Sequence, residues 1–285
     1  MKRQDFRFFH PLRVRWVEVD MQKIVFNAHY LMYFDTAISD YWRALSLPYV
    51  EAMHLLEGDL YVKKASIEFI SSAHFDDTLD VALRLSRIGN SSIVFTGAIF
   101  RGDELLITSE LVYVFADPKT QTSKSVPDVL RQLLLGFETG QPTYDIKTGS
   151  WAELGTDAAQ VRIEVFVHEQ KIPLELECDE ADQTALHAVA YNTLGQAIGT
   201  ARLLEHTAKT AKIGRMAVKR VLRGSSIGRD LLNVLMGHAK QRGNQEVMLH
   251  AQRSAQGFYA RAGFLVRGEP FEEASIPHIE MTSAL

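Results

Sequence analysis

The stretch RGSSIGRDLL, residues Arg223–Leu232, decides how the second half of this chain is interpreted. Small or flexible residues at 224–228 come directly before a helical pattern of apolar positions over 231–239. A helix begins with unpaired N–H groups and the positive end of its dipole, so its start attracts phosphate. Arg223 and Arg229 add positive charge beside it. Taken alone, the run fits an ordinary strand-to-helix turn equally well.

A tyrosine downstream favours the phosphate interpretation. Tyr259 belongs to a short aromatic segment that begins at Phe258 and ends at Gly263-Phe264. A phenol keeps its proton at neutral pH and gives it to a strong base, such as a thiolate, that forms beside it. The turn and the phenol together predict a coenzyme A thioester site with Tyr259 as the acid. The alternative is that Tyr259 is an aromatic residue of the core.

The turn resembles the R-x-x-G-x-G/A signature of the GNAT acyltransferases, with Arg223 first, Gly228 last and Ser226 in place of the middle glycine. A serine there either crowds the diphosphate or donates a hydrogen bond to it. The resemblance to ElaA-like members runs from about Tyr144 to the end of the chain. It rests on further segments in the same order: Val165–Gln170, Asp179–Asp182, Ile213–Val218, Ala251–Gln252 and Ile276–His278.

This resemblance implies an α/β GNAT domain, with a mixed, mostly antiparallel sheet and flanking helices, that transfers an acetyl or acyl group from acyl-CoA to a small amine. It implies that Tyr259 protonates the departing thiolate. The expected coenzyme-binding residues are Met216, Ala217, Val218, Arg223, Gly224, Ser225, Ser226, Ile227, Gly228, Arg229 and Gln252. Glu169 and His278 are the candidate bases for the amine. His250, after an apolar strand, is interpreted as a structural residue.

The first half has a different pattern. One largely apolar helix is expected from Asn27 to about Leu45, and strands are expected at Tyr61–Ile70, Leu79–Ile88, Ser92–Phe100 and Leu105–Phe115. Gly89-Asn90 and Gly102-Asp103 separate the last three strands as hairpin turns. An antiparallel sheet that wraps around one buried helix satisfies this pattern. The domain boundary is predicted at Gly140, which gives domains at 1–140 and 141–285.

Arg15–Asp20 and Ile24–Leu31 resemble the hotdog thioesterases of the 4-hydroxybenzoyl-CoA thioesterase type, over about residues 8–135. The resemblance implies an α+β hotdog domain that dimerises. It also implies that Asp20 acts as base or nucleophile towards an acyl-CoA thioester. Asn27 is expected to cap the helix whose N–H groups hold the carbonyl oxygen. Lys23 occupies a position where this family usually has glycine; Asp20 as a solvated loop acid is the alternative.

The composition limits the other function classes. Hydrophobic residues make up 46% and charged residues 23% of the 285 residues, which is typical of a globular protein. The net charge of −4 gives no general attraction for nucleic acid. Cys178, the only cysteine, excludes an internal disulfide and a cysteine-rich zinc site, and its acidic neighbours disfavour the thiolate. No membrane partner, metal or tightly bound cofactor is expected, and the expected location is the cytoplasm.

The sequence therefore predicts a bifunctional coenzyme A thioester enzyme, with an N-terminal acyl-CoA thioesterase-like domain and a C-terminal N-acyltransferase domain. Two alternatives stay open. In one, only one half is active. In the other, the chain is a coenzyme A ligand sensor or assembly protein whose sites have lost their chemistry.

Overall fold

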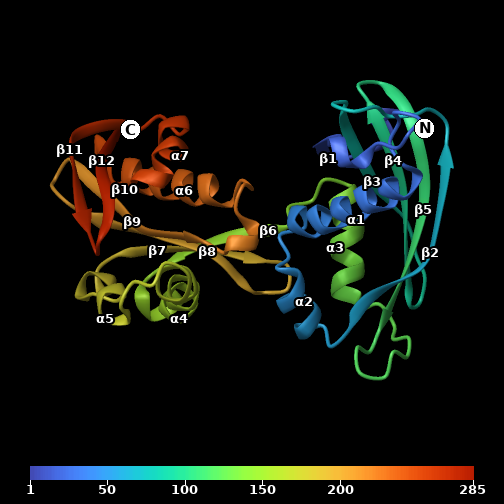
Figure 1. The fold of residues 1–285 in the computed structure, drawn as a ribbon. Coiled ribbons are helices and arrows are strands. Elements are labelled where there is room, and N and C mark those ends of the chain that lie inside the picture. The colour runs from blue at the N-terminus through green and yellow to red at the C-terminus, as the bar shows by residue number, and fades with distance from the viewer. The chain divides into compact units, whose positions relative to one another are not determined.

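The computed structural model describes residues 1–285 and divides into two compact units, Met1–Thr143 and Tyr144–Leu285. Each unit has one sheet with helices packed against it (Figure 1). The division lies a few residues beyond Gly140, because the segment that follows stays with the first unit. There the hydroxyl of Thr143 lies 2.8 Å from the hydroxyl of Ser46. No helix has both the length and the apolar composition that a membrane span requires.

The first sheet has five antiparallel strands in the order β1-β3-β4-β5-β2. The strands are β1 (Phe8–Arg13), β2 (Asp59–Phe69), β3 (Thr78–Ile88), β4 (Ser92–Arg101) and β5 (Glu104–Ala116). The predicted strands correspond to β2 to β5, and Gly102 at the β4–β5 turn has a φ of 60°. The sequence pattern did not predict β1 because Pro11 interrupts it. Since β1 is an edge strand, the missing N–H of Pro11 is tolerated.

The long helix α1 (Asn27–Ala44) packs against this sheet and supplies much of the core. Phe34 of α1 rests on Gly97 of β4, where an added Cβ would lie 2.5 Å from the phenylalanine ring. Glycine therefore permits the close approach of helix and sheet. Tyr41, also fully buried, donates a hydrogen bond of 2.9 Å to the carboxylate of Glu138. The unit also contains α2 (Tyr49–Leu55), α3 (Asp128–Glu138), and two 3-10 turns, η1 (Arg3–Asp5) and η2 (Trp16–Glu18).

The second sheet has seven strands in the order β11-β12-β10-β9-β8-β7-β6. They are β6 (Tyr144–Gly149), β7 (Leu186–Asn192), β8 (Ala197–Glu205), β9 (Thr210–Val218), β10 (Glu246–Gln252), β11 (Leu265–Glu273) and β12 (Ile276–Ala284). Every pair is antiparallel except β9 with β10. The helices are α4 (Trp151–Arg162), the π-helix η3 (Ile163–Glu169), α5 (Leu174–Glu177), α6 (Ile227–Gln241) and α7 (Gln256–Arg261), with 3-10 turns η4 (Glu180–Gln183), η5 (Arg220–Leu222) and η6 (Arg253–Ala255).

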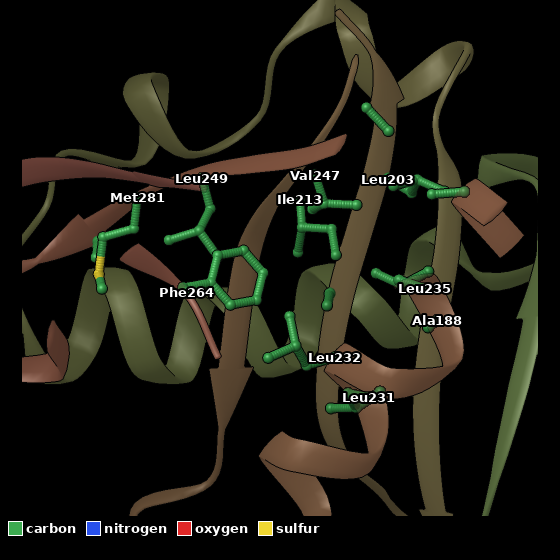
Figure 2. Close-up of a cluster of buried hydrophobic side chains, with 14 of the residues drawn as sticks. Ala188, Leu203, Ile213, Leu231, Leu232, Leu235, Val247, Leu249, Phe264 and Met281 are labelled. Carbon is green, nitrogen blue, oxygen red and sulfur yellow. The ribbon is translucent and has the colours of Figure 1, made fainter. Parts of the chain in front are cut away.

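The two faces of this sheet bury different helices. On one face α6 places a row of leucines against the strands and Phe264 (Figure 2). The opposite face packs against α4, through contacts such as Leu154 and Val161 with Val189. At Gly199 of β8 an added Cβ would lie 3.0 Å from Ile227, so glycine lets the first turn of α6 approach the sheet. This packing fixes where α6 begins.

The centre of the second sheet opens between its two parallel strands. β9 pairs with β10 only over 210–212 and 246–248, and beyond Lys212 the strands continue without pairing. On its other side β9 stays paired with β8, with a register shift at which Arg202 lies opposite Gly214 and Thr200 opposite Ala217. The extra residues form a bulge. The free edge of β9 therefore carries backbone N–H and C=O groups that no neighbouring strand uses.

Candidate functional sites

A cavity of about 940 Å³ lies in the second unit at the start of α6. All but three of the predicted coenzyme-binding residues line this cavity. The three exceptions are Ala217, Ile227 and Gln252. Ala217 is buried against α4, Ile227 is fully buried in the α6 core, and Gln252 donates a 2.9 Å hydrogen bond to the side chain of Gln170. The lining is Met216, Val218, Leu222, Arg223, Gly224, Ser225, Ser226, Gly228, Arg229, Ala255, Phe258, Tyr259, Arg261 and Ala262.

The turn before α6 has the geometry of an anion site. Gly224 has a φ of 84°, a left-handed conformation that a residue without a Cβ adopts at little cost. Ser226 is the N-cap of α6, and Ile227 is the first residue of the helix. The N–H groups of the first helical turn have no intrahelical partner, and they form the positive end of the helix dipole. The turn can therefore bind a phosphate group through backbone donors.

Arg223 is already engaged in an ion pair. Its two terminal nitrogens donate to the two carboxylate oxygens of Glu169, at 2.6 and 2.7 Å, and its Nε donates to the carbonyl of Val218 at 3.1 Å. The hydrogen bonds from Arg223 hold the pKa of Glu169 below its ordinary value, although partial burial opposes this. A carboxylate with a lowered pKa is a weaker base. Arg229, with a side chain 65% exposed and only a long contact of 3.8 Å to Asp230, is the more available cation.

Ser226 belongs to a hydrogen-bonded chain. The hydroxyl of Tyr144 donates to Asp230 at 2.5 Å and lies 2.7 Å from the hydroxyl of Ser226. Because a phenol has one proton and Tyr144 gives it to the carboxylate, Ser226 is the donor to Tyr144. The proton of Ser226 is therefore used within the protein. The sequence analysis did not select Tyr144 or Asp230, because only the fold brings them to this turn.

Tyr259 lies in the same cavity as the turn. Its hydroxyl is 3.6 Å from the sulfur of Met216, and its ring meets Phe258 and Phe264 edge to face. Burial raises the pKa of Tyr259 to about 12, so the phenol holds its proton at neutral pH. The structure thus places a protonated hydroxyl beside the β9 bulge. Arg261, one helical turn after Phe258, also lines the cavity, and the sequence analysis did not select it.

The bulge next to Met216 is held by a network of charged side chains. Arg215 has a φ of 48°, and its guanidinium donates to the carbonyl of Glu177 at 3.0 Å and to the carboxylate of Asp179 at 3.0 Å. Asp179 also accepts hydrogen bonds from Arg202 of β8, at 2.6 and 2.7 Å. The segment from Asp179 to Asp182 therefore anchors the bulge.

Cys178 and His278 are the other two residues of this unit that the sequence analysis considered for chemical roles. Cys178 donates to the carboxylate of Glu177 at 2.9 Å, and this bond, with burial, raises the pKa of the thiol to about 11. The thiolate is thus disfavoured. His278, the second candidate base, is 9% exposed, its Nδ1 lies 2.8 Å from the carbonyl oxygen of Ile276, and its ring stacks on Phe271. A carbonyl oxygen only accepts, so Nδ1 of His278 is the donor.

The first unit contains a smaller cavity, of about 360 Å³, at the start of α1. Asp20 and Asn27 both line it. Asp20 lies in a tight turn: its carboxylate accepts from the N–H of Gln22 at 2.8 Å, and its carbonyl accepts from the N–H of Lys23 at 2.9 Å. Lys23 has a φ of 63°, the left-handed conformation in which glycine is favoured. The Asp20 carboxylate and the N-terminus of α1 thus border one cavity.

The predicted cap of α1 is wrong. Phe26 is the N-cap, and Asn27 is the first helical residue, whose side chain makes no capping bond. The N–H of Phe26 donates to the carbonyl of Glu18, which fixes the start of the helix instead. Glu18 itself is 2% exposed and accepts hydrogen bonds from Arg15 and from Tyr33, so it anchors the loop that holds Asp20. Sequence reasoning missed Glu18 because a buried carboxylate looks like any loop acid until its partners are known.

The matches to known protein families fall on either side of the boundary between the two units. A family model described as an acetyltransferase (GNAT) domain matches residues 154–285, and one described as the thioesterase superfamily matches residues 22–108. YjcF of Bacillus subtilis, described as an uncharacterised N-acetyltransferase, is 34% identical over 126 residues, which are 44% of this chain and 89% of YjcF. ElaA of Escherichia coli is 31% identical over 126 residues, 43% of this chain and 82% of ElaA.

For the first unit, a crystal structure of a 1,4-dihydroxy-2-naphthoyl-CoA thioesterase from Synechocystis aligns with 45% of this chain and 95% of that one, at 18% identity and a TM-score of 0.42. The two matched families fall in different units of the structure. The chain thus joins a hotdog domain of the thioesterase superfamily to an ElaA-like domain, and through the latter it belongs to the GNAT acetyltransferase family.

Proposed function

We propose that the chain acts on coenzyme A thioesters at two sites, transferring an acetyl or acyl group to a small amine in the second unit and hydrolysing an acyl-CoA in the first. One observation carries the proposal. Tyr259 and the turn at 223–229 line a single cavity, beside the free edge of β9. The cavity thus combines a place for a diphosphate, a strand edge and a proton donor.

In the second unit, the diphosphate would bind the N–H groups at the start of α6, with Arg229 and Arg261 at the rim. The amide groups of the pantetheine arm would pair with the free backbone groups of β9 near Met216. The amine then attacks the thioester carbonyl, and the C–S bond breaks. Tyr259 gives its proton to the sulfur, which a hydroxyl with a raised pKa can do throughout the neutral range.

In the first unit, Asp20 would act as a base towards water, or attack the thioester carbon directly. The N–H groups at the start of α1, near Asn27, would stabilise the oxyanion. The support is that Asp20 and Asn27 border the same cavity. We also propose that this unit forms the dimer contact, because Phe69 and Ile70, next to that cavity, are 56% and 58% exposed. Analytical ultracentrifugation of the full chain would test the dimer.

The proposed function is tested by assaying purified protein against a panel of acyl-CoAs, with and without amines. Released thiol is followed by a colorimetric reagent and the acylated amine by mass spectrometry. Tyr259→Phe should reduce transfer only, and Asp20→Asn should reduce hydrolysis only. Tyr61→Phe and Asp103→Asn, two changes outside both cavities, serve as matched controls. Release of thiol that neither active-site change affects would refute both assignments.

A second candidate function is a regulatory protein that binds a coenzyme A ligand without turnover. The pairing of Glu169 with Arg223 favours it, because the carboxylate cancels a charge that a phosphate would otherwise use. So does Lys23, which stands in the Asp20 turn with a φ of 63°, a conformation that costs a residue with a Cβ energy. Native mass spectrometry that shows bound acyl-CoA, together with no turnover on any panel member, would support this candidate. Turnover at one site only would leave one catalytic and one binding unit.

A further inference from the structure

An unassigned cluster of titratable side chains lies on the second sheet. Nδ1 of His250 on β10 is 3.1 Å from a carboxylate oxygen of Glu273, at the end of β11, and 3.4 Å from Nζ of Lys212 on β9. The ring of Phe271 packs edge-on against His250, with centroids 4.8 Å apart. The His250 side chain is 27% exposed, so the ring is held from several sides and still reaches solvent.

The cluster lies on the face of the sheet opposite α6. Val247, Leu249 and Ala251 of β10 are buried in the α6 core. Because side chains alternate along a strand, His250 and Gln252 point to the other face. Lys212 is the last residue of β9 that pairs with β10, so His250 stands where the two strands begin to separate. The turn at 223–229 and His250 are therefore on opposite sides of the same opening.

The contact between His250 and Glu273 determines which ring nitrogen is free. Nδ1 of His250 lies closer to the Glu273 carboxylate, at 3.1 Å, than to Nζ of Lys212, at 3.4 Å, and an ionised carboxylate has no proton to give. In the shorter contact Nδ1 therefore donates to Glu273, and Lys212 is a neighbouring charge and not a donor to the ring. In the neutral ring the lone pair is then on Nε2. A carboxylate that orients a histidine in this way, and stabilises its protonated form, is the arrangement of a general base.

Two carboxylates lie on the same face of the sheet as His250. Glu273 contacts its Nδ1, and Glu280 is its cross-strand partner. Glu280 is paired with Arg267, whereas Glu273 has no arginine partner. Glu273 is therefore the carboxylate here that can attract a cation from solution. An amine substrate is a cation at neutral pH, and it must lose a proton before its nitrogen can attack.

We propose that this face is the binding site of a cationic primary amine and that His250 accepts its proton, with Glu273 as a positioning residue. The inference rests on the proposed acyl transfer in the second unit. The ammonium gives one proton to Nε2 of His250, which passes it to solvent. The neutral nitrogen forms the C–N bond, the C–S bond breaks with its electrons on sulfur, and Tyr259 protonates the sulfur. The second proton of the nitrogen then returns to the Tyr259 oxygen.

Other charged groups face His250 and set the conditions for its protonation. Lys212 lies on β9, Glu273 on β11, and Glu280 and His278 on β12, where Glu280 is the cross-strand partner of His250. Around the ring, Lys212 places a positive charge and the two carboxylates place negative charges. Replacing Glu273 by glutamine removes one of these negative charges but retains an oxygen that can accept from Nδ1.

The test is the pH dependence of acetyl transfer by the full chain, with 1,4-diaminobutane and acetyl-CoA as the probes. His250→Gln should lower kcat at pH 7 by about 100-fold, the order expected of a lost general base. The difference in kcat between this variant and the wild type should become smaller as the pH rises towards the pKa of the amine, because the amine then loses its proton to solvent and needs no base from the protein. Glu273→Gln should move the ascending limb of the wild-type profile to lower pH. His206→Gln, at an exposed position outside the cluster, should match the wild type.

The outcomes separate this inference from the function on which it rests. If the wild-type protein acetylates no member of an amine panel that includes 1,4-diaminobutane, the acyl transfer itself is refuted. If the wild type transfers but His250→Gln keeps the wild-type rate and profile, His250 is not the base. An equal loss at every pH, with a lowered melting temperature, would make His250 a structural residue and would also overturn the inference. Calorimetric titration with acetyl-CoA should show unchanged affinity in both variants.

Discussion

Arg223 and Glu169 form a two-pronged ion pair, with both terminal nitrogens of the guanidinium within 2.7 Å of the carboxylate. The pair joins the end of the π-helix η3 to the turn at 223–229, the proposed phosphate site. Fork-to-fork geometry is the strongest arrangement for these groups, and an incoming phosphate must compete with it. The charge at this end of the cavity is therefore set by a residue of η3 as well as by the turn.

The first prediction is that Glu169→Gln tightens acetyl-CoA binding by about threefold to tenfold, because Arg223 then carries a charge that no carboxylate cancels. Titration calorimetry at low and high salt measures this, and the gain should shrink as salt rises. Since the pKa of Glu169 is lowered, the carboxylate stays ionised down to acidic pH, and the gain should be constant across the neutral range. Unchanged affinity with a large loss of rate would instead make Glu169 the base.

The second prediction concerns Tyr259→Phe, which removes the hydroxyl and keeps the ring between Phe258 and Phe264. Acetyl transfer should slow by about 100-fold while acetyl-CoA affinity changes little. Because burial raises the pKa of Tyr259 to about 12, the wild-type rate should not decline from loss of this proton below about pH 11. Transfer at the wild-type rate, when chemistry limits turnover, would make Tyr259 a core residue.

The third prediction separates the two effects of Ser226. Its hydroxyl proton is already given to Tyr144, so Ser226→Ala should bind acetyl-CoA as the wild type does. Ser226→Gly also removes the Cβ, so it should tighten binding by about threefold if that atom crowds the diphosphate. Equilibrium titration of the two variants side by side decides between crowding and donation. Weaker binding by Ser226→Ala would show that the hydroxyl donates to the ligand.

Local patterns predicted much of the fold. The Gly102-Asp103 turn and the alternation on either side of it predicted β4 and β5, because a hairpin depends on neighbouring residues. The turn at 223–229 also needed only local reasoning, since small residues before an apolar helical pattern describe a helix start. These parts of the structure are encoded by residues that are close in sequence.

Contacts between distant residues were not predictable in the same way. Glu169 was selected as a base and lies 54 positions from Arg223, whose charge it pairs with. His250 was interpreted as structural, because nothing near it in sequence revealed Glu273, 23 positions away. A lone histidine or carboxylate has no distinctive spacing, so its partner, and hence its chemistry, emerges only when strands are brought together.

The fourth prediction is that Asp20→Asn lowers acyl-CoA hydrolysis by about 100-fold or more while the melting temperature stays within a few degrees. The asparagine oxygen still accepts from the N–H of Gln22, so the turn keeps its hydrogen bond. Its amide is neither a base nor a good nucleophile. A thiol-release assay with a panel of acyl-CoAs measures the loss, and hydrolysis equal to the wild type would make Asp20 a solvated loop acid.

The last prediction uses Lys23, whose φ of 63° is strained for a residue with a Cβ. Left-handed backbone costs such a residue about 1–2 kcal/mol, so Lys23→Gly should stabilise the first unit by about 1 kcal/mol after the larger entropy of the unfolded glycine chain is subtracted. Lys23→Ala removes the ammonium but keeps the strain, so it should not raise the melting temperature. Thermal unfolding of both variants separates strain from charge. If both raise the melting temperature equally, the charge of Lys23, and not its backbone, is what destabilises the turn. If hydrolysis rises in Lys23→Gly alone, the strained turn also holds Asp20 away from its best position for the reaction.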